Sequence, residues 1–252
     1  MTEQLAVAVL GANGRMGAEA VKAVEAAPDM KLVAALGRGD SLDTLLSAGA
    51  RFVVDLTVPE STVENVRFAV ENGMHAVVGT TGWDTAKLQE LDALLAGRPD
   101  VGVLIAPNFA LGSVLASAFA AKASKYFESV EIIELHHPDK VDAPSGTAVR
   151  TAQLIAAERA AAGLEPSPDA TTSELAGARG CEVDGVRVHS VRLRGLVAHQ
   201  EVLLGGPGEQ FTLRHDSFDR ASFMPGVLLG IRNIADHPGL TVGLDGYLDL
   251  GL

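Results

Sequence analysis

The chain has 252 residues, which is long enough for one large domain or two domains of ordinary size with buried cores. Hydrophobic residues make up 47% of it and aromatic residues 4%, a balance that is typical of an α/β protein and excludes a disordered chain. The formal net charge of −12 argues against a nucleic-acid partner and an anionic membrane surface, although local basic residues could still bind an anionic small molecule.

The N-terminal segment and the cysteine content bear on where the protein is located and on whether it binds a metal. No basic leader precedes the first apolar run, and no uninterrupted apolar stretch reaches membrane-spanning length. The single cysteine, Cys181, cannot form an intrachain disulfide, and no Cys-x-x-Cys pair offers a zinc site. We therefore expect a cytoplasmic protein that contacts no membrane and binds no metal.

Short apolar runs rich in β-branched residues alternate with helical patterns through the first half of the chain. We expect strands at 5–10, 31–36, 51–56, 75–79 and 101–106, and helices at 15–27, 60–72 and 84–96. Strands that alternate with helices through short connections form a parallel sheet. The first half therefore predicts a Rossmann-like, doubly wound α/β fold.

The pattern changes after the first half. We expect a helix at about 110–126, a strand at 129–136, a polar loop and a helix near 147–163. A turn-rich connection at 164–180 then leads to apparent antiparallel strands at 186–193, 197–205 and 209–216. A helix at about 219–236 and a short strand follow. We predict two domains. A dinucleotide-binding domain comprises 1–108 and is completed by 218–252, and an α+β domain with a mixed, largely antiparallel sheet comprises 109–217.

A glycine-rich turn follows the first strand. Gly11, Gly14 and Gly17 in "GANGRMG" lie between the first expected strand and the first expected helix. Glycine lets the backbone approach a pyrophosphate, which then contacts the amides at the helix N-terminus. The alternative is a tight turn without a ligand. The context of strand, glycines and helix favours dinucleotide binding.

The second strand lacks the acidic residue that commonly binds the cofactor's ribose. That strand ends in "AALGRGD", with Gly37 at the expected place and Arg38 after it. Arg38 could pair with a 2′-phosphate, helped by Arg15, which would favour NADP; the alternative is a solvated surface charge. Thr80, Thr81 and Asn108 follow later strands, at the edge of the sheet where ligands bind.

The loop "ELHHPDKVDAPSGTA" combines two histidines with a lysine. Pro138 favours an end to the strand between His136 and His137, and Lys140 is close enough in sequence to return toward either imidazole. Histidine and a desolvated lysine can both transfer protons near neutral pH. Metal binding is a poor alternative, because Lys140 beside a cation is unfavourable and adjacent histidines rarely chelate one ion.

The same loop ends in a potential anion site. Ser145, Gly146 and Thr147 stand at the N-terminus of the helix expected near 147–163, where free amides and hydroxyls could bind a carboxylate. Simple N-capping is the alternative and also fits these residues. The nearby histidines and lysine favour a substrate site.

Five motifs occur in one order along the chain: "GANGRMG", "VVGTTG", "APNFA", "ELHHPDKVDAPSGTA" and "VHSVRL". Together they resemble the 4-hydroxy-tetrahydrodipicolinate reductase (dihydrodipicolinate reductase) family of lysine and diaminopimelate biosynthesis, over essentially the whole chain. The resemblance implies reduction of 4-hydroxy-tetrahydrodipicolinate to tetrahydrodipicolinate with NADPH or NADH. It also implies a small dicarboxylate substrate and a homotetramer assembled through the second domain.

The resemblance further implies roles for individual residues. It makes His136 and Lys140 the proton-transferring pair. The implied substrate contacts are His137, Ser145, Gly146, Thr147 and Arg220. The implied cofactor contacts are Gly11, Ala12, Asn13, Gly14, Arg15, Met16, Arg38, Gly79, Thr80, Thr81, Ala106, Pro107, Asn108 and Phe109. Asp139 departs from the family pattern, in which a histidine commonly precedes the lysine, and Gly37 leaves the choice between NADH and NADPH open.

Two other functions fit parts of this pattern. A reductase of the same two-domain type could act on a different anionic substrate, such as an amino acid or a sugar acid. A regulator that senses a dinucleotide would bind the cofactor without turnover, but it would leave the His136 and Lys140 arrangement without a purpose.

Overall fold

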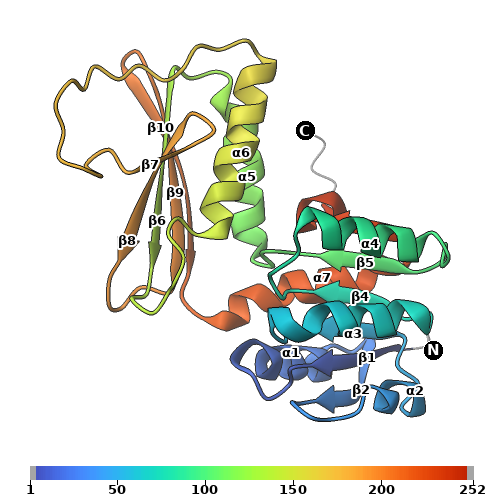
Figure 1. Ribbon diagram of the computed structural model, residues 1–252. Helices are drawn as coiled ribbons and strands as arrows, with labels where there is room; N and C mark the ends of the chain where they lie inside the picture. The colour runs from blue at the N-terminus through green and yellow to red at the C-terminus, as the bar shows by residue number, and fades with distance from the viewer. Residues whose placement is uncertain (1–3, 249–252) are drawn as a thin grey trace. The chain divides into compact units, whose positions relative to one another are not determined.

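The computed structural model describes residues 4–248. Two compact units divide the chain (Figure 1). One unit extends from the N-terminal part to Ala110 and resumes at Arg220, and the other comprises Leu111–Asp219. The outermost residues of the predicted first domain, 1–3 and 249–252, lie outside the described residues.

The first unit is built on a six-stranded sheet with the order β11-β5-β4-β3-β1-β2, in which every neighbouring pair is parallel. Its elements are β1 (Leu5–Leu10), α1 (Arg15–Ala26), β2 (Met30–Leu36), α2 (Asp43–Ser47), β3 (Phe52–Asp55), α3 (Pro59–Glu71), β4 (His75–Val78), α4 (Thr85–Leu95), β5 (Gly102–Ile105), η1 (Arg220–Phe223), α7 (Met224–Asn233), η2 (Ile234–Asp236), β11 (Gly239–Val242) and η3 (Leu244–Tyr247). This is the predicted Rossmann-like fold, and that prediction is confirmed.

Local sequence accounts for the boundaries of these elements. All four residues of β3, β4 and β5 are buried, as expected for central strands with helices on both faces. Pro59 begins α3, where its missing N–H costs nothing, and the Asp84 side chain caps α4 by accepting a hydrogen bond from the Lys87 amide at 2.9 Å.

The order of the strands also locates the ligand edge of this sheet. The chain runs outward from β1 to β2 on one side and from β1 to β3 and β4 on the other. The sheet therefore changes direction between β1 and β3. In open parallel sheets, a crevice for ligands opens beyond the carboxyl ends of the strands at this point.

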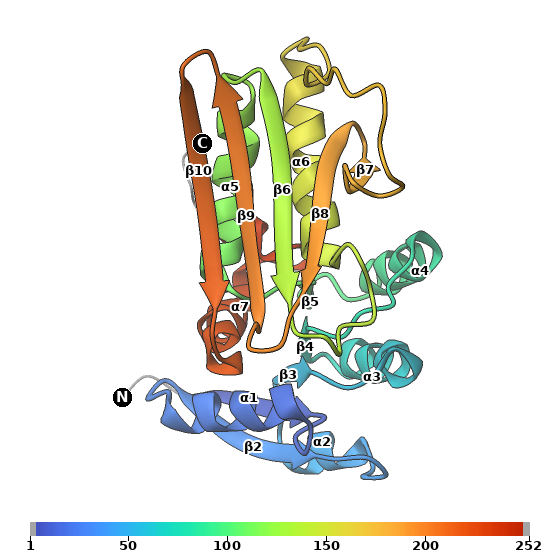
Figure 2. The ribbon, with the colours of Figure 1, turned by 90° about the vertical axis from the view of Figure 1, so that its left-hand side faces the viewer.

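The second unit packs two helices on one face of a five-stranded sheet (Figure 1). Its elements are α5 (Leu111–Ser124), β6 (Ser129–His136), α6 (Gly146–Ala161), β7 (Cys181–Val183), β8 (Val186–Arg192), β9 (Ala198–Gly206) and β10 (Glu209–Ser217). The strand order is β10-β9-β6-β8-β7 (Figure 2), and the buried residues of β6, β8 and β9 form the core with α5 and α6.

Three details differ from the sequence-based expectations. The pair β6 and β8 is parallel, although β8 was expected to be antiparallel, because α6 and a long connection return the chain to the starting end of the sheet. The short elements α2 and β7 were not expected. The predicted helix at 219–236 is wrong as one element: it is divided into η1, α7 and η2, with Pro225 in the first turn of α7. No helix of the described residues is long and apolar enough to cross a membrane.

Candidate functional site

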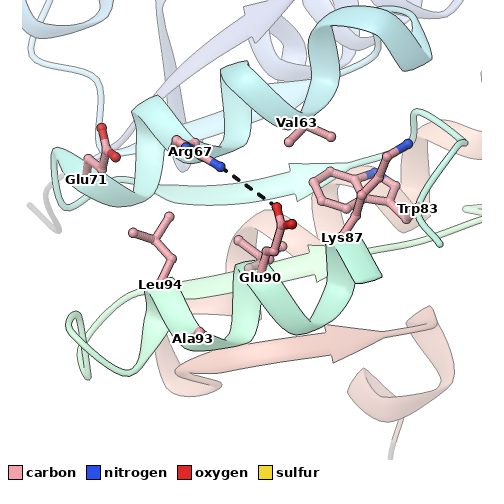
Figure 3. A pocket seen from close by; sticks show the side chains of 9 residues that line it. Val63, Arg67, Glu71, Trp83, Lys87, Glu90, Ala93 and Leu94 are labelled. Carbon is pink, nitrogen blue, oxygen red and sulfur yellow. Dashed lines mark ion pairs between the residues drawn. The ribbon is translucent and has the colours of Figure 1, made fainter. Parts of the chain in front are cut away.

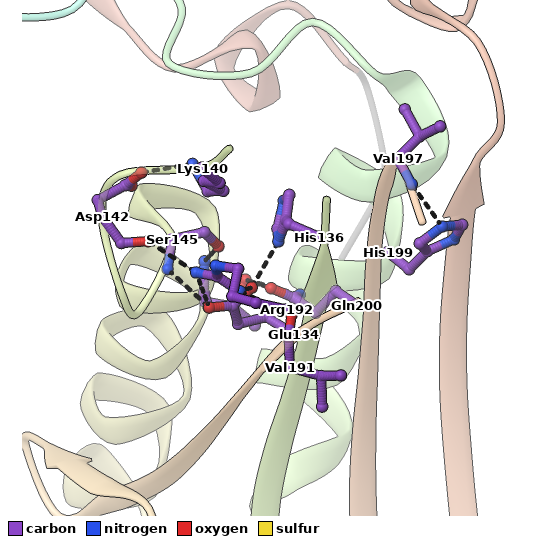
Figure 4. Close-up of polar contacts among 12 residues, drawn as sticks. Glu134, His136, Lys140, Asp142, Ser145, Val191, Arg192, Val197, His199 and Gln200 are labelled. Carbon is purple, nitrogen blue, oxygen red and sulfur yellow. Dashed lines mark hydrogen bonds and ion pairs between the residues drawn. The ribbon is translucent and has the colours of Figure 1, made fainter. Parts of the chain in front are cut away.

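The carboxyl end of β6 carries the histidine that the sequence predicted as a proton-transfer residue. The strand ends at His136, and a turn follows in which the Lys140 amide donates to the His137 carbonyl at 3.2 Å. The loop then reaches Ser145 and α6. Figure 4 shows the site, with Lys140, Asp142 and Ser145 of the loop on one side of His136 and Glu134.

Glu134 is the buried centre of this site. Its side chain is completely inaccessible, and its two carboxylate oxygens accept hydrogen bonds from several groups. His136 Nδ1 lies 2.5 Å from Oε2, Arg192 donates to both oxygens at 2.8 Å, and the Ser145 amide donates to Oε1 at 3.2 Å. Burial raises the pKa of Glu134, but the hydrogen bonds from His136, Arg192 and Ser190 outweigh it and lower the pKa to about 2.

Sequence analysis missed Glu134 and Arg192. Arg192 is far from Glu134 along the chain, and the parallel pairing of β6 with β8 brings it there by placing Arg192 opposite His136. A local signal for Glu134 did exist. Along β6 the side chains of Val130 and Ile132 face the core, and the alternation places Glu134 on the same buried face. A buried carboxylate at such a position needs donors, so its presence indicates a polar site.

Lys140 is paired with a carboxylate and not with an imidazole. Its ammonium donates to Asp142 Oδ1 at 2.7 Å. Asp142 in turn accepts a hydrogen bond from Arg192 at its backbone carbonyl, at 2.6 Å. Burial raises the pKa of Asp142 while the hydrogen bond from Lys140 lowers it, and the net direction is downward. The structure therefore holds Lys140 in the loop through Asp142.

The predicted anion site at the start of α6 is partly committed to the helix itself. Ser145 is buried, and its hydroxyl caps α6 by accepting from the Ala148 amide at 3.2 Å. Gly146 is exposed and has open space around it, so a ligand could approach its backbone. The Gly146 amide also contributes to the low pKa of Asp142. N-capping thus explains Ser145, and Gly146 and Thr147 remain the candidates for substrate contact.

A second buried polar group lies behind the site, between the helices and β9. The Ser117 and Thr151 hydroxyls are 2.8 Å apart, and Gln200 donates to Thr151 at 3.0 Å. Nearby on β9, His199 contacts Asp216 through Nδ1 at 2.7 Å and accepts the Val197 amide at Nε2 at 3.2 Å. Both ring nitrogens of His199 are thus engaged by groups of the second unit.

Four of the predicted cofactor residues, Gly11, Asn13, Gly14 and Arg38, line a cavity of about 550 Å³ in the first unit. Its walls come from the carboxyl ends of β1 and β2 and from the segment after β3, which is the place where the sheet changes direction. The lining residues are Leu10, Gly11, Asn13, Gly14, Leu36, Gly37, Arg38, Gly39, Asp40, Leu42, Leu56, Thr57, Val58, Ser61, Glu64 and Asn65.

The glycines of this cavity fit a pyrophosphate. Gly11 has φ +77°, and a Cβ atom there would meet the Leu56 carbonyl oxygen at 2.5 Å. Gly14 caps α1 without a side-chain hydrogen bond, so the first amides of this twelve-residue helix are open to an anion. Gly17 lets α1 approach the Gly11 backbone closely. The residues present therefore suit a dinucleotide.

A carboxylate reaches the cavity although β2 does not end in one. A Cβ atom at Gly37 would overlap the Asn13 side chain, so an acid at position 37 would need Asn13 to move. Asp40, three residues later, accepts the Gly37 amide at 2.8 Å and lines the same cavity beside Arg38. Asp40 was not predicted, because the acid was expected at the end of β2 itself.

A buried aspartate organises the loops that follow β3 and β4. Asp55 is completely buried and accepts hydrogen bonds from the Thr57 hydroxyl at 2.7 Å, from Asn65 at 2.9 Å and from the Thr80 hydroxyl at 2.8 Å. The Thr80 hydroxyl is therefore occupied by Asp55. Sequence analysis did not identify Asp55 either.

The other predicted cofactor residues do not line the cavity. These are Ala12, Arg15, Met16, Gly79, Thr80, Thr81, Ala106, Pro107, Asn108 and Phe109. Phe109 is buried and packs where a Cβ atom of Gly79 would lie, and Asn108 accepts the Ala110 amide at 2.9 Å. Arg220, the predicted carboxylate partner, lies in η1 of the first unit. The roles of these residues stay predictions.

Another hollow of the first unit is unrelated to the predicted residues. It has a volume of about 350 Å³ and lies between α3 and α4 (Figure 3). Trp83, Leu91 and Leu94 form its apolar wall, and Arg67 and Glu90 approach each other at 4.0 Å across it. None of its lining residues is a predicted site residue.

Comparison with known proteins identifies the family. The model of the dihydrodipicolinate reductase N-terminus matches residues 5–109, and the model of its C-terminus matches residues 112–248. The 4-hydroxy-tetrahydrodipicolinate reductase of Streptomyces griseus subsp. griseus is 64% identical over 247 residues, covering 98% of this chain and 99% of the relative. That of Nocardia farcinica is 62% identical over 244 residues, covering 97% and 98%.

A solved structure supports the same assignment. Dipicolinate-bound dihydrodipicolinate reductase from Paenisporosarcina sp. TG-14 shares 40% identity with this chain and superimposes with a TM-score of 0.87, covering 97% of this chain and 100% of its own. The resemblance that the motifs suggested is thus confirmed by sequence and by fold. The chain belongs to the dihydrodipicolinate reductase family, whose curated members are 4-hydroxy-tetrahydrodipicolinate reductases.

Proposed function

We propose that His136 and Lys140 supply the proton when this chain, as a member of its family, reduces 4-hydroxy-tetrahydrodipicolinate. The observation that carries the proposal is the placement of His136. The ring stands at the end of β6, only 13% exposed, with Nδ1 against the buried Glu134 carboxylate. Nε2 is therefore the nitrogen available for proton transfer.

Residues of the first unit would hold the nicotinamide cofactor. The amides at the start of α1 and the backbone at Gly11 suit the pyrophosphate, and Arg38 suits a 2′-phosphate. When bound, the cofactor supplies a hydride to the unsaturated substrate. Asp40 offers an acceptor for ribose hydroxyls in the same cavity, so we expect the chain to use both NADPH and NADH, with NADPH favoured by Arg38.

Reduction by a hydride leaves negative charge that a nearby acid must neutralise. His136 is placed to donate from Nε2, because its other nitrogen is held by Glu134. The substrate is a dicarboxylate, like the dipicolinate bound to the reductase from Paenisporosarcina sp. TG-14. Its two carboxylates need cations and hydrogen-bond donors, and Lys140, His137, Gly146, Thr147 and Arg220 are our candidates.

The test is cofactor oxidation with freshly generated 4-hydroxy-tetrahydrodipicolinate, with NADPH and NADH in parallel. We expect turnover by the unaltered chain and a loss of roughly 100-fold or more in kcat for His136→Gln and Lys140→Ala, the usual size of a general-acid contribution. Both variants should keep their affinity for the cofactor. Unchanged kcat in both variants would refute the proton-transfer assignment, and absent turnover by the unaltered chain would refute the substrate.

Assembly and location are separate parts of the proposal. We infer a homotetramer formed through the second unit, because the face of its sheet opposite α5 and α6 carries partly exposed side chains such as Ile133, Leu135 and Leu203. Light scattering coupled to size exclusion would give about four times the mass of 26.1 kDa. A cytoplasmic location stays a prediction, which a fluorescent fusion would test.

A further inference from the structure

We propose that Glu134 is a positioning residue that fixes the His136 ring in the tautomer with its proton on Nδ1. The inference deepens the proposed function, since it names the group that selects which nitrogen of His136 meets the substrate. It rests on the geometry at the end of β6, where one buried carboxylate joins a strand, a loop and a helix terminus (Figure 4).

The position of Glu134 is unusual for a strand residue. Val130 and Ile132 precede it on the same face of β6 and are 1% and 0% exposed within the apolar core. A hydrophobic residue would complete that core at lower free energy, because a buried carboxylate loses its hydration. A carboxylate placed there instead must have a purpose that an apolar side chain cannot serve.

The hydrogen bonds of Glu134 determine the tautomer of His136. The carboxyl is ionised over the whole neutral range because of its low pKa, and an ionised carboxylate can only accept hydrogen bonds. A ring nitrogen 2.5 Å from Oε2 must therefore donate to it. In the neutral ring Nε2 is then an unprotonated acceptor, and in the imidazolium Nε2 carries the proton that can be transferred.

The two oxygens of Glu134 are not equivalent, and the difference predicts what a neutral substitute would do. Oε1 accepts from Arg192 Nη2 and from the Ser145 amide, whereas Oε2 accepts from Arg192 Nη1 and from His136. The Oε1 donors, an arginine and a backbone amide, cannot become acceptors. The imidazole can reverse its role by changing tautomer, and the Ser190 hydroxyl, which also bonds Glu134, can do so by rotating.

Glu134→Gln should therefore orient its carbonyl oxygen toward Arg192 Nη2 and the Ser145 amide. Its NH₂ group would then face Arg192 Nη1, whose hydrogen bond is lost, and His136, where it can donate to Nδ1 only if the ring moves its proton to Nε2. The substitution keeps the volume and shape of the side chain while it reverses the tautomer of the ring. The variant also lacks the carboxylate that stabilises the imidazolium form of His136.

The first experiment measures the tautomer directly in the unaltered chain. Long-range ¹H–¹⁵N correlation of the His136 ring, recorded at a pH where the ring is neutral, should show a protonated Nδ1 and an unprotonated Nε2. The measurement needs no variant and no substrate, so it remains decisive even if the proposed substrate is wrong. A ring protonated at Nε2 would overturn the inference.

The second experiment uses Glu134→Gln together with Glu134→Asp. We expect Glu134→Gln to shift the neutral ring to the Nε2 tautomer and to lower kcat by roughly 100- to 10,000-fold, with KM changed little and cofactor affinity unchanged. Glu134→Asp keeps an ionised acceptor, so it should retain the Nδ1 tautomer and recover part of the rate. A purely structural ion pair with Arg192 would instead leave the tautomer and kcat of folded Glu134→Gln unaltered, which would overturn the inference.

A matched control lies three residues earlier on the same strand. Glu131 also contacts a histidine and an arginine, His189 at 2.7 Å and Arg179, but its side chain is 30% exposed. Glu131→Gln thus removes a comparable charge from β6 without touching His136. It should leave kcat and the His136 tautomer unchanged. An equal loss of kcat in Glu131→Gln would show that the loss follows from removing any carboxylate of β6, which would refute a specific role for Glu134.

Discussion

Lys140, which we propose for the substrate site, forms an ion pair with Asp142. Lys140 is 23% exposed and Asp142 is 49% exposed, so water screens their attraction. Asp142 is nevertheless held in place, because Arg192 donates to its carbonyl while Lys140 donates to its carboxylate. A substrate carboxylate that binds Lys140 must displace Asp142 or share the ammonium with it.

Asp142→Asn should therefore strengthen substrate binding. Without the Asp142 charge, Lys140 can bind a substrate carboxylate without first losing an ion pair. We expect KM for 4-hydroxy-tetrahydrodipicolinate to fall by roughly two- to fivefold, the equivalent of an exposed ion pair of about 0.5–1 kcal/mol. Steady-state kinetics at fixed cofactor concentration would measure it. Asp139→Asn, which removes an exposed charge from the same loop, is the control and should change KM less; a higher KM in Asp142→Asn would show that Asp142 assists binding.

At the scale of elements, one arginine joins the end of α5 to α6 and to the connection that follows. Arg159 on α6 is 7% exposed, and its guanidinium donates to four backbone carbonyls, those of Ser124, Phe127, Glu128 and Glu165. Ser124 is the last residue of α5, and its carbonyl accepts from both the Phe127 amide and Arg159, so Arg159 contributes to the C-terminal cap of this helix. Burial lowers the pKa of Arg159, as expected for a buried cation.

Replacing Arg159 with leucine should destabilise the second unit. The substitution fills a similar volume but leaves several buried carbonyls without donors, and we expect the free energy of unfolding to fall by about 2–4 kcal/mol. Chemical denaturation followed by circular dichroism would measure the loss. Arg150→Leu, an exposed position of the same helix, serves as the control and should stay within about 0.5 kcal/mol. Equal stability of the two variants would show that water replaces the guanidinium.

The elements also show what sequence patterns can and cannot predict. The buried strands and amphipathic helices of the first unit were located to within a few residues, because apolar runs and capping residues such as Pro59 and Asp84 are local signals. The short elements α2 and β7 have too few residues to show a period. The parallel pairing of β6 with β8 depends on where a long connection leads, and no residue on either strand specifies that path.

At the scale of the whole molecule, the predicted site residues are divided between the two units. The predicted cofactor residues belong to the first unit, and the predicted proton-transfer pair belongs to the second. The motifs predicted the glycine turn and the histidine loop as ligand-binding segments, because their residue types and their order along the chain are those of the family. The groups that hold these segments, Glu134, Arg192 and Asp55, were missed. The alternation along β6 was a local signal for Glu134, but the donors that give Glu134 its role come partly from β8, which pairs with β6 only in the fold. Asp55 likewise gains its partners from the segment after β3 and from Thr80 after β4.

This division predicts that cofactor choice can be altered without affecting proton transfer. Arg38 lines the cavity of the first unit, and no hydrogen bond or ion pair of the described residues engages its side chain. Arg38→Ala should weaken NADPH binding by roughly 10- to 100-fold, the loss of one hydrogen-bonded charge, and leave NADH binding nearly unchanged. Titration calorimetry without substrate measures both affinities.

The control is Lys31→Ala, which removes an exposed cation from the same strand, β2, outside the cavity. It should weaken the binding of NADPH and of NADH by no more than about twofold, because salt screens a charge outside the cavity. With saturating NADH, Arg38→Ala should also keep the kcat and substrate KM of the unaltered chain, because Lys140 and His136 belong to the other unit. Equal weakening of NADPH and NADH by Arg38→Ala would mean that the arginine supports the shape of the cavity and does not read the 2′-phosphate.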